Sequence, residues 1–184
     1  MNVFVNRDET DDLLSEVGKH FVGGLLARAS STAPFVAPTI NGYKRLKPHS
    51  FAPNKATWSH ENRGAMIRVV GGPGDEVSHI ENRMGEPCAN PYLFMASQVI
   101  VGLDGIRNKV DPGPLDREPY DADRPALPQS LEDAVLALRE DDALFREKMS
   151  DAWMDYFLML KESEIARFRD HVTDWEQREY FEMF

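Results

Sequence analysis

Residues 64–83 have the sequence GAMIRVVGGPGDEVSHIENR, and this stretch decides the fold. Residues 64–70 and 77–83 have the length and the β-branched content of strands, and the glycine-rich stretch between them is typical of a turn. We therefore predict two strands that run antiparallel on either side of this turn.

The second of these strands has an unusual polar face. Side chains alternate along a strand, so His79, Glu81 and Arg83 fall on one face and Ile80 on the other. The pattern alone favours a face that is exposed to solvent, and a face that lines a polar pocket is the alternative.

Helices are indicated on both sides of the strands, because apolar residues recur at helical spacing after capping residues. Asn90 and Pro91, a cap and a first-turn residue, begin a strongly apolar helix that we expect to be buried. The predicted helices cover residues 10–29, 90–109, 130–139, 141–148, 150–171 and 173–182. Residues 30–62 and 110–128 are rich in loop-forming residues and are predicted to be mostly irregular. The predicted fold class is α+β, with antiparallel strands packed against C-terminal helices.

The composition narrows the class of protein. The chain has 184 residues, of which 42% are hydrophobic and 28% charged, an ordinary balance for a globular protein. It shows no apolar run of membrane-spanning length and no signal peptide, so we expect no membrane partner. A single cysteine, Cys88, rules out an internal disulfide and is consistent with a reducing cytoplasm. The net charge of -10 argues against nucleic acid as a partner.

The charge is distributed unevenly along the chain. Residues 40–68 hold six lysines and arginines and one acid, Glu61. A basic segment in an acidic protein indicates a local anionic ligand, and merely solvated lysines are the alternative. Arg45, Arg63 and Arg68 are the strongest candidates, because a planar guanidinium can bind two oxygens of a carboxylate or phosphate at once. The sequence has no Walker loop, dinucleotide-binding glycine motif or Cys/His cluster, so the residues alone support only an anion site.

Five short blocks resemble characteristic blocks of the glutamine synthetase family, in the same order. They are Pro-Thr-Ile-Asn-Gly-Tyr-Lys-Arg-Leu at 38–46, Asn-Arg-Gly-Ala-Met-Ile-Arg at 62–68, Ile-Glu-Asn-Arg at 80–83, Ala-Asn-Pro-Tyr-Leu at 89–93 and Gly-Leu-Asp-Gly-Ile at 102–106. The resemblance extends from Asn2 nearly to the end of the chain. It implies that residues 1–184 are the C-terminal portion of a glutamine synthetase catalytic domain, without the N-terminal domain and the first half of the catalytic sheet.

The resemblance also implies a chemistry. Family members use ATP and Mg²⁺ or Mn²⁺ to phosphorylate the side-chain carboxylate of glutamate, and an amine then displaces the phosphate. Phosphoryl transfer depends on charge neutralisation, which arginines and divalent ions supply. By position, the catalytic contacts would be Arg45, Arg63 and Arg83, the ATP contacts Arg68 and His79, and the metal ligand Glu81. His79 stands where the family carries an arginine.

One departure from the family concerns the amine. Ammonia-using members carry a glutamate in the loop after the Tyr-Lys-Arg-Leu block, and here Phe51 stands in that position. A phenyl ring cannot bind ammonium through a carboxylate, but it can pack against an alkyl or aryl amine. We therefore expect an amine other than ammonia, as in the γ-glutamylamide synthetases, with His49 or Trp58 as further candidates for the pocket. The alternative is that Phe51 only packs in its loop.

A second departure concerns the metal site. The Glu-x-Glu and His-x-His strands that hold further metal ligands in the family have no counterpart in this sequence. One carboxylate, Glu81, cannot hold a catalytic divalent ion. We therefore predict that this chain alone has no ligase activity. The family resemblance separately implies that the full-length protein is a homo-oligomer. A non-catalytic remnant that serves as an anion-binding or assembly module is the alternative from another class, and a generic small-anion-binding domain is a third.

Overall fold

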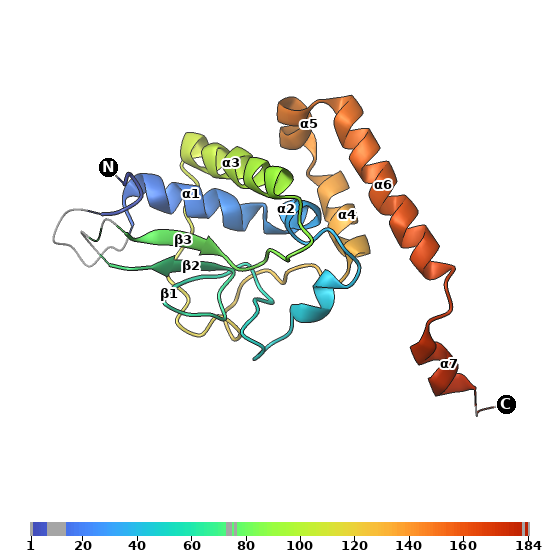
Figure 1. The fold of residues 1–184 in the computed structure, drawn as a ribbon. Helices are drawn as coiled ribbons and strands as arrows, with labels where there is room; N and C mark the ends of the chain where they lie inside the picture. The colour runs from blue at the N-terminus through green and yellow to red at the C-terminus, as the bar shows by residue number, and fades with distance from the viewer. Residues whose placement is uncertain (1, 7–13, 73–74, 76, 182, 184) are drawn as a thin grey trace.

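A three-stranded sheet lies at the centre of the fold in the computed structural model (Figure 1). The strands are β1 (Trp58–His60), β2 (Ile67–Val70) and β3 (His79–Asn82), in the order β1-β2-β3. β2 and β3 are antiparallel, which confirms the two predicted strands, and β1 pairs with β2 in parallel. The structure describes residues 2–6, 14–72, 75, 77–181 and 183.

Two helices, α1 (Glu16–Ala27) and α3 (Pro91–Asn108), lie side by side above the sheet (Figure 1). They approach so closely that a Cβ atom on Gly24 would lie 2.2 Å from the carbonyl oxygen of Val101. A glycine in the middle of a helix costs stability on its own, so its position here is explained by this close packing. The helix was predicted to cover residues 10–29, of which residues 10–13 lie outside the described part of the chain.

The segment before the sheet is more ordered than predicted. Residues 30–62 were expected to be mostly irregular, but they include most of α2 (Ala29–Val36), the 3₁₀ helix η1 (Gly42–Arg45) and β1. Phe35 of α2 packs in the core, where its ring centroid lies 4.8 to 6.2 Å from those of three aromatic residues: Phe145, Trp153 and Phe157. The prediction was wrong for these segments, because tertiary burial of small side chains outweighs the loop preference of serine and proline.

The C-terminal half is helical, as predicted. It contains α4 (Leu131–Glu140), α5 (Ala143–Met149), α6 (Asp151–Arg169) and α7 (Asp174–Tyr180), and these helices confirm the α+β class. α6 runs away from the sheet and carries α7 at its far end (Figure 1). None of the helices in the described part of the chain combines the length and the apolar character that a bilayer crossing requires.

The predicted cap of α3 is present, but the helix is not fully buried. The Asn90 side chain accepts hydrogen bonds from the backbone N–H groups of Tyr92 and Leu93. Val101 is buried against α1, whereas Met95 lies on the exposed side of the helix. The helix was predicted to be buried because its sequence is strongly apolar, and that pattern did not distinguish the buried face from the exposed one.

Candidate functional site

The register of the sheet brings Arg68 and Glu81 together. Arg68 of β2 is the Cα partner of Glu81 in β3, and residues directly opposite each other share a face of the sheet. Arg83 follows two residues later and returns to the same face. Ile67 and Val69 alternate with these residues and are buried in the core. The sheet thus separates a charged face from an apolar one.

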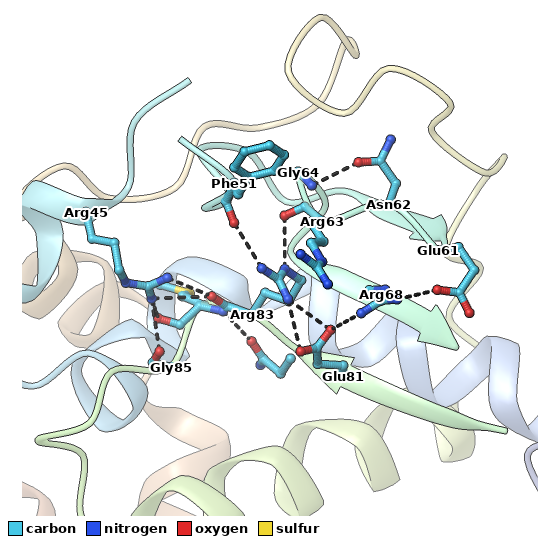
Figure 2. A network of polar contacts seen from close by, with 12 residues as sticks. Arg45, Phe51, Glu61, Asn62, Arg63, Gly64, Arg68, Glu81, Arg83 and Gly85 are labelled. Atoms are coloured by element: carbon cyan, nitrogen blue, oxygen red, sulfur yellow. Dashed lines mark hydrogen bonds and ion pairs between the residues drawn. The ribbon is translucent and has the colours of Figure 1, made fainter. Parts of the chain in front are cut away.

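Arg83 is the central residue of the charged face (Figure 2). Its Nη1 donates to both carboxylate oxygens of Glu81 at 3.0 Å. Its Nε donates to the carbonyl oxygen of Arg63 at 2.9 Å, and its Nη2 to that of Phe51 at 3.0 Å. One guanidinium therefore connects the end of β3 to the turn before β2 and to the loop that carries Phe51.

Arg68 binds two carboxylates. Its Nη1 lies 3.4 Å from Oε2 of Glu81, and its Nη2 donates a short hydrogen bond to Glu61. Glu61 also accepts from the backbone N–H of Gly71 at 3.1 Å. The Nε of Arg68 is buried and has no hydrogen-bond partner within the described chain.

Arg45 binds backbone carbonyl groups. Its Nη2 donates to Met84 at 2.7 Å and to Gly85 at 3.0 Å, and both Nη atoms donate to the carbonyl oxygen of Arg83. The partly buried surroundings of the guanidinium lower the pKa of Arg45, against the opposing charge of Glu86. Arg45 is therefore bonded to the backbone of residues 83–85, the segment that follows β3 and carries Arg83.

Arg63 completes the group. Its side chain is exposed, and its guanidinium makes no hydrogen bond or ion pair with any other described residue. Figure 2 shows it in the same group as Arg68, Arg83 and Glu81. Of the four arginines that the sequence singled out, Arg68 and Arg83 therefore pair with Glu81, and Arg45 is bonded to the backbone that follows β3. The unengaged guanidinium of Arg63 leaves a cation ready for an anionic ligand.

The electrostatics of the group favour an anion. Partial burial acts to raise the pKa of Glu81, but the hydrogen bond and charge of Arg83, followed by those of Arg68, outweigh it and hold this pKa below its ordinary value. The hydrogen bond from Arg68 likewise lowers the pKa of Glu61, and so does the one from the backbone of Gly71. Both carboxylates are therefore ionised at neutral pH, and the four guanidinium groups still outnumber them.

His79 shares the strand face of Glu81 but is not bonded to the arginines in the described part of the chain. It is exposed at the start of β3, where it is the Cα partner of Val70, and its Nδ1 lies 3.1 Å from the carbonyl oxygen of Val77. Within the described residues it makes no hydrogen bond to Arg68 or Arg83. The solvent-facing arrangement that the strand pattern favours therefore holds for His79 but not for Arg83, whose side chain is 18% exposed.

The loop that carries Phe51 presents its ring outward. Phe51 is 72% exposed, and both it and His49 have left-handed backbone conformations, with φ near 56° and 57°. The ring of His49 packs on that of Tyr120, with centroids 5.0 Å apart. Trp58, in contrast, is buried in β1. The backbone of Phe51 thus holds Arg83 while its side chain is open to a ligand.

The residues of this chain fit phosphate groups better than they fit a metal ion. The exposed guanidinium of Arg63 has no partner among the described residues, and a planar guanidinium suits the oxygens of a phosphate group. In contrast, no group of three or more His, Cys, Asp or Glu side chains within the described part of the chain could hold a metal. Glu81, the predicted metal ligand, is paired with Arg68 and Arg83.

Two carboxylates of the site were not singled out from the sequence. Glu61 pairs with Arg68, and Glu86 binds Thr39 just before η1. For Glu61 a signal existed, because it is the lone acid of the basic segment. Glu86 had no such signal, because its partner lies 47 residues away along the chain.

Comparison with known proteins places the chain in a family. The catalytic domain of glutamine synthetase matches residues 1–180. The chain is 47% identical to a gamma-glutamylanilide synthase from an Acinetobacter species, over 99% of this chain and 38% of that protein. It is 37% identical to a glutamine synthetase from Thermococcus kodakarensis, over 98% of this chain and 44% of that protein. The chain therefore spans about two fifths of the length of these relatives.

Solved structures agree with this assignment. A GmaS/ADP complex superposes with a TM-score of 0.83 and 32% identity, over 99% of this chain and 43% of that one. An apo GmaS structure gives a TM-score of 0.81 and 33% identity, over 97% of this chain and 41% of that one. Sequence blocks, fold and relatives agree, and the chain belongs to the glutamine synthetase family of carbon–nitrogen ligases.

Proposed function

We propose that this chain is the C-terminal portion of an ATP-dependent ligase that joins the γ-carboxyl group of glutamate to an amine other than ammonia. The observation that carries the proposal is the loop at Phe51. Its carbonyl oxygen is bonded to Arg83, 3.0 Å away, and its ring is 72% exposed beside the arginine group. An apolar surface therefore adjoins a site for anions.

The proposed reaction has two steps. A γ-carboxylate oxygen of glutamate attacks the terminal phosphorus of ATP, and ADP leaves. The nitrogen of the amine then attacks the carbonyl carbon of the γ-glutamyl phosphate, loses a proton and releases phosphate. Arg45, Arg63 and Arg83 would bind the glutamate and its acyl phosphate, and Arg68 the phosphates of ATP. Their role is to neutralise charge that moves between the oxygens of a phosphoryl group.

We further propose that the catalytic metal ion depends on residues outside this chain. Glu81 is the single carboxylate here that the family resemblance assigns to metal, and both its oxygens accept hydrogen bonds from Arg83. Mg²⁺ and Mn²⁺ prefer several oxygen ligands. Glu81 would therefore bind metal only together with carboxylates from the rest of the protein. His79 stays a proposed ATP contact.

The identity of the amine follows from the surface that meets it. An aromatic amine can stack on or pack edge-to-face against a phenyl ring, whereas ammonium needs an anionic partner. The gamma-glutamylanilide synthase among the relatives supports an aromatic amine. Together with the single cysteine, the family also supports a cytoplasmic enzyme, and we propose a homo-oligomer for the full-length protein.

Amine-dependent phosphate release by the full-length gene product tests the proposal. Ammonium, ethylamine and aniline would be compared at saturating ATP and glutamate. We expect aniline or ethylamine to exceed ammonium in kcat/KM, Phe51→Glu to shift the preference toward ammonium, and Phe51→Leu to keep the preference for an apolar amine. A clear preference for ammonium by the unmodified protein would refute the amine assignment, and an absence of glutamate-dependent turnover would refute the ligase itself.

A further inference from the structure

Glu86 joins the segment that leads to Arg45 with the segment that carries Arg83. Oε1 of Glu86 accepts a hydrogen bond from the backbone N–H of Thr39 at 2.9 Å, and Oε2 accepts one from the hydroxyl group of Thr39 at 3.1 Å. The backbone N–H of Glu86 in turn donates to the carbonyl oxygen of Val36 at 3.0 Å. Glu86 is half-buried and directs both oxygens to a single residue at the turn that leads into η1.

The chain makes room for this carboxylate at Gly42. A Cβ atom built on Gly42 would lie 2.3 Å from Oε2 of Glu86, closer than any real contact. Gly42 opens η1, and its backbone N–H donates to the Thr39 hydroxyl group at 3.1 Å. The glycine, the threonine and the carboxylate therefore form one contact, which sets where η1 starts.

The segment of residues 39–45 and the segment of residues 83–86 are joined by a second set of contacts. Arg45, at the end of η1, donates to the carbonyl oxygens of residues 83–85. Glu86 reaches from the end of that stretch to the start of η1. Each segment thus contributes one charged side chain that binds the other, and together these contacts fix the separation of Arg45 and Arg83.

We propose that Glu86 is a positioning residue for glutamate binding, which sets the relative placement of Arg45 and Arg83 through Thr39. This inference rests on the proposed function, in which these two arginines bind the glutamate substrate. Both carboxylate oxygens of Glu86 are bonded to Thr39, so we assign it no direct contact with the substrate. Because two arginines that grip one carboxylate must be held to within a fraction of an ångström, release of the turn at Thr39 misplaces them. Arg68, which is assigned to ATP, lies on the sheet and is not held by this contact.

The activity test is a split between two Michaelis constants in the full-length enzyme. Glu86→Ala is expected to raise KM for glutamate about tenfold or more, with KM for ATP changed less than about twofold. Glu86→Asp keeps the charge and both acceptors and is expected to recover part of the loss. Glu176→Ala is the matched control, because Glu176 also accepts a hydrogen bond from a threonine backbone N–H, that of Thr173 at 2.7 Å, but in α7. The control is expected to leave both constants unchanged.

A double-mutant cycle tests whether the contact acts as proposed. Gly42→Ala alone is expected to displace the carboxylate and to raise KM for glutamate as Glu86→Ala does. The combined variant Glu86→Ala/Gly42→Ala is expected to be no worse than Glu86→Ala, because the clash is then gone. Multiplying effects on KM would show that the two residues act independently and would overturn the proposal, as would equal increases in both Michaelis constants.

A measurement on the 184-residue chain separates this inference from the proposed function. Amide hydrogen exchange at Thr39 reports its bond to Glu86 without any ligase activity. Glu86→Ala is expected to speed this exchange about tenfold, the loss of one hydrogen bond, and to leave Val101 in α3 unchanged. Unchanged exchange at Thr39 would overturn the inference even in an active enzyme. Faster exchange in a protein without glutamate-dependent turnover would instead count against the proposed function alone.

Discussion

Replacing Arg83 with methionine should destabilise the folded chain by a measurable and calculable amount. The substitution keeps the apolar stem but removes the hydrogen bonds to the carbonyl oxygens of Arg63 and Phe51. Each such bond contributes about 1 kcal/mol net. The pair with Glu81 adds less than about 1 kcal/mol, because that carboxylate is 38% exposed and keeps Arg68 as a partner. Relief of repulsion between the arginines acts against these terms. We expect a net loss of about 2 kcal/mol.

Urea unfolding of the 184-residue chain would measure this loss. With an m value of about 2 kcal/mol/M, the midpoint should fall by about 1 M. Arg83→Lys keeps the charge without the planar fork and should lose about half as much. Arg169→Met is the control, because Glu132 of α4 is the one ion-pair partner of Arg169 among the described residues, and such an exposed pair contributes less than about 0.5 kcal/mol. Equal midpoints for Arg83→Met and Arg169→Met would refute the assignment of Arg83 as the central residue.

Three further predictions concern charge, packing and capping. The folded-state pKa of Glu81 lies below the ordinary glutamate value of 4.5, so its stabilising contribution is present above that pH and is lost as the pH falls through the folded pKa. In urea unfolding at a series of pH values, the wild type should therefore lose stability relative to Glu81→Gln below about pH 4.5, and parallel curves would contradict the ion pairs. Gly24→Val should cost about 3 kcal/mol or prevent folding, because its Cβ would lie 2.2 Å from the carbonyl oxygen of Val101, as circular dichroism would show. Asn90→Ala should lower the unfolding free energy by about 1 kcal/mol through loss of the α3 cap, whereas Asn90→Ser should not.

The sequence predicted elements whose signals are local. The helices that were predicted to begin at residues 90, 130 and 173 are capped in the structure by the side chains of Asn90, Ser130 and Thr173, each of which bonds to backbone two or three positions further on. The strands β2 and β3 were predicted for the same reason, since a turn and the strands that flank it are read from one continuous stretch. The helix α2 was missed because it is stabilised by distant contacts, such as that of Phe35 with Phe157.

The arginines of the candidate site were named from the sequence, but two of its carboxylates and its connections were not. The basic segment and the family blocks named the four arginines, and the register of the sheet then placed Arg68 opposite Glu81. No pattern in the sequence indicated that Arg83 would donate to the carbonyl oxygen of Phe51, 32 residues earlier, because a backbone acceptor carries no side-chain signature. The same holds for the carbonyl groups that Arg45 binds. Long-range bonds to backbone are therefore the part of a site that sequence reasoning misses.

Because Arg83 binds the backbone at residue 51, the side chain at this position can change without removing the bond. The loop at residue 51 is tied to Arg83 through a carbonyl oxygen, which every amino acid possesses, and its side chain is free of that bond. The identity of residue 51 can therefore vary without loss of the contact that orients the arginine. A site built in this way keeps Arg83 in place while the side chain that we propose meets the amine changes. A glutamate and a phenylalanine are then alternatives at one position, with Arg83 held the same way by either.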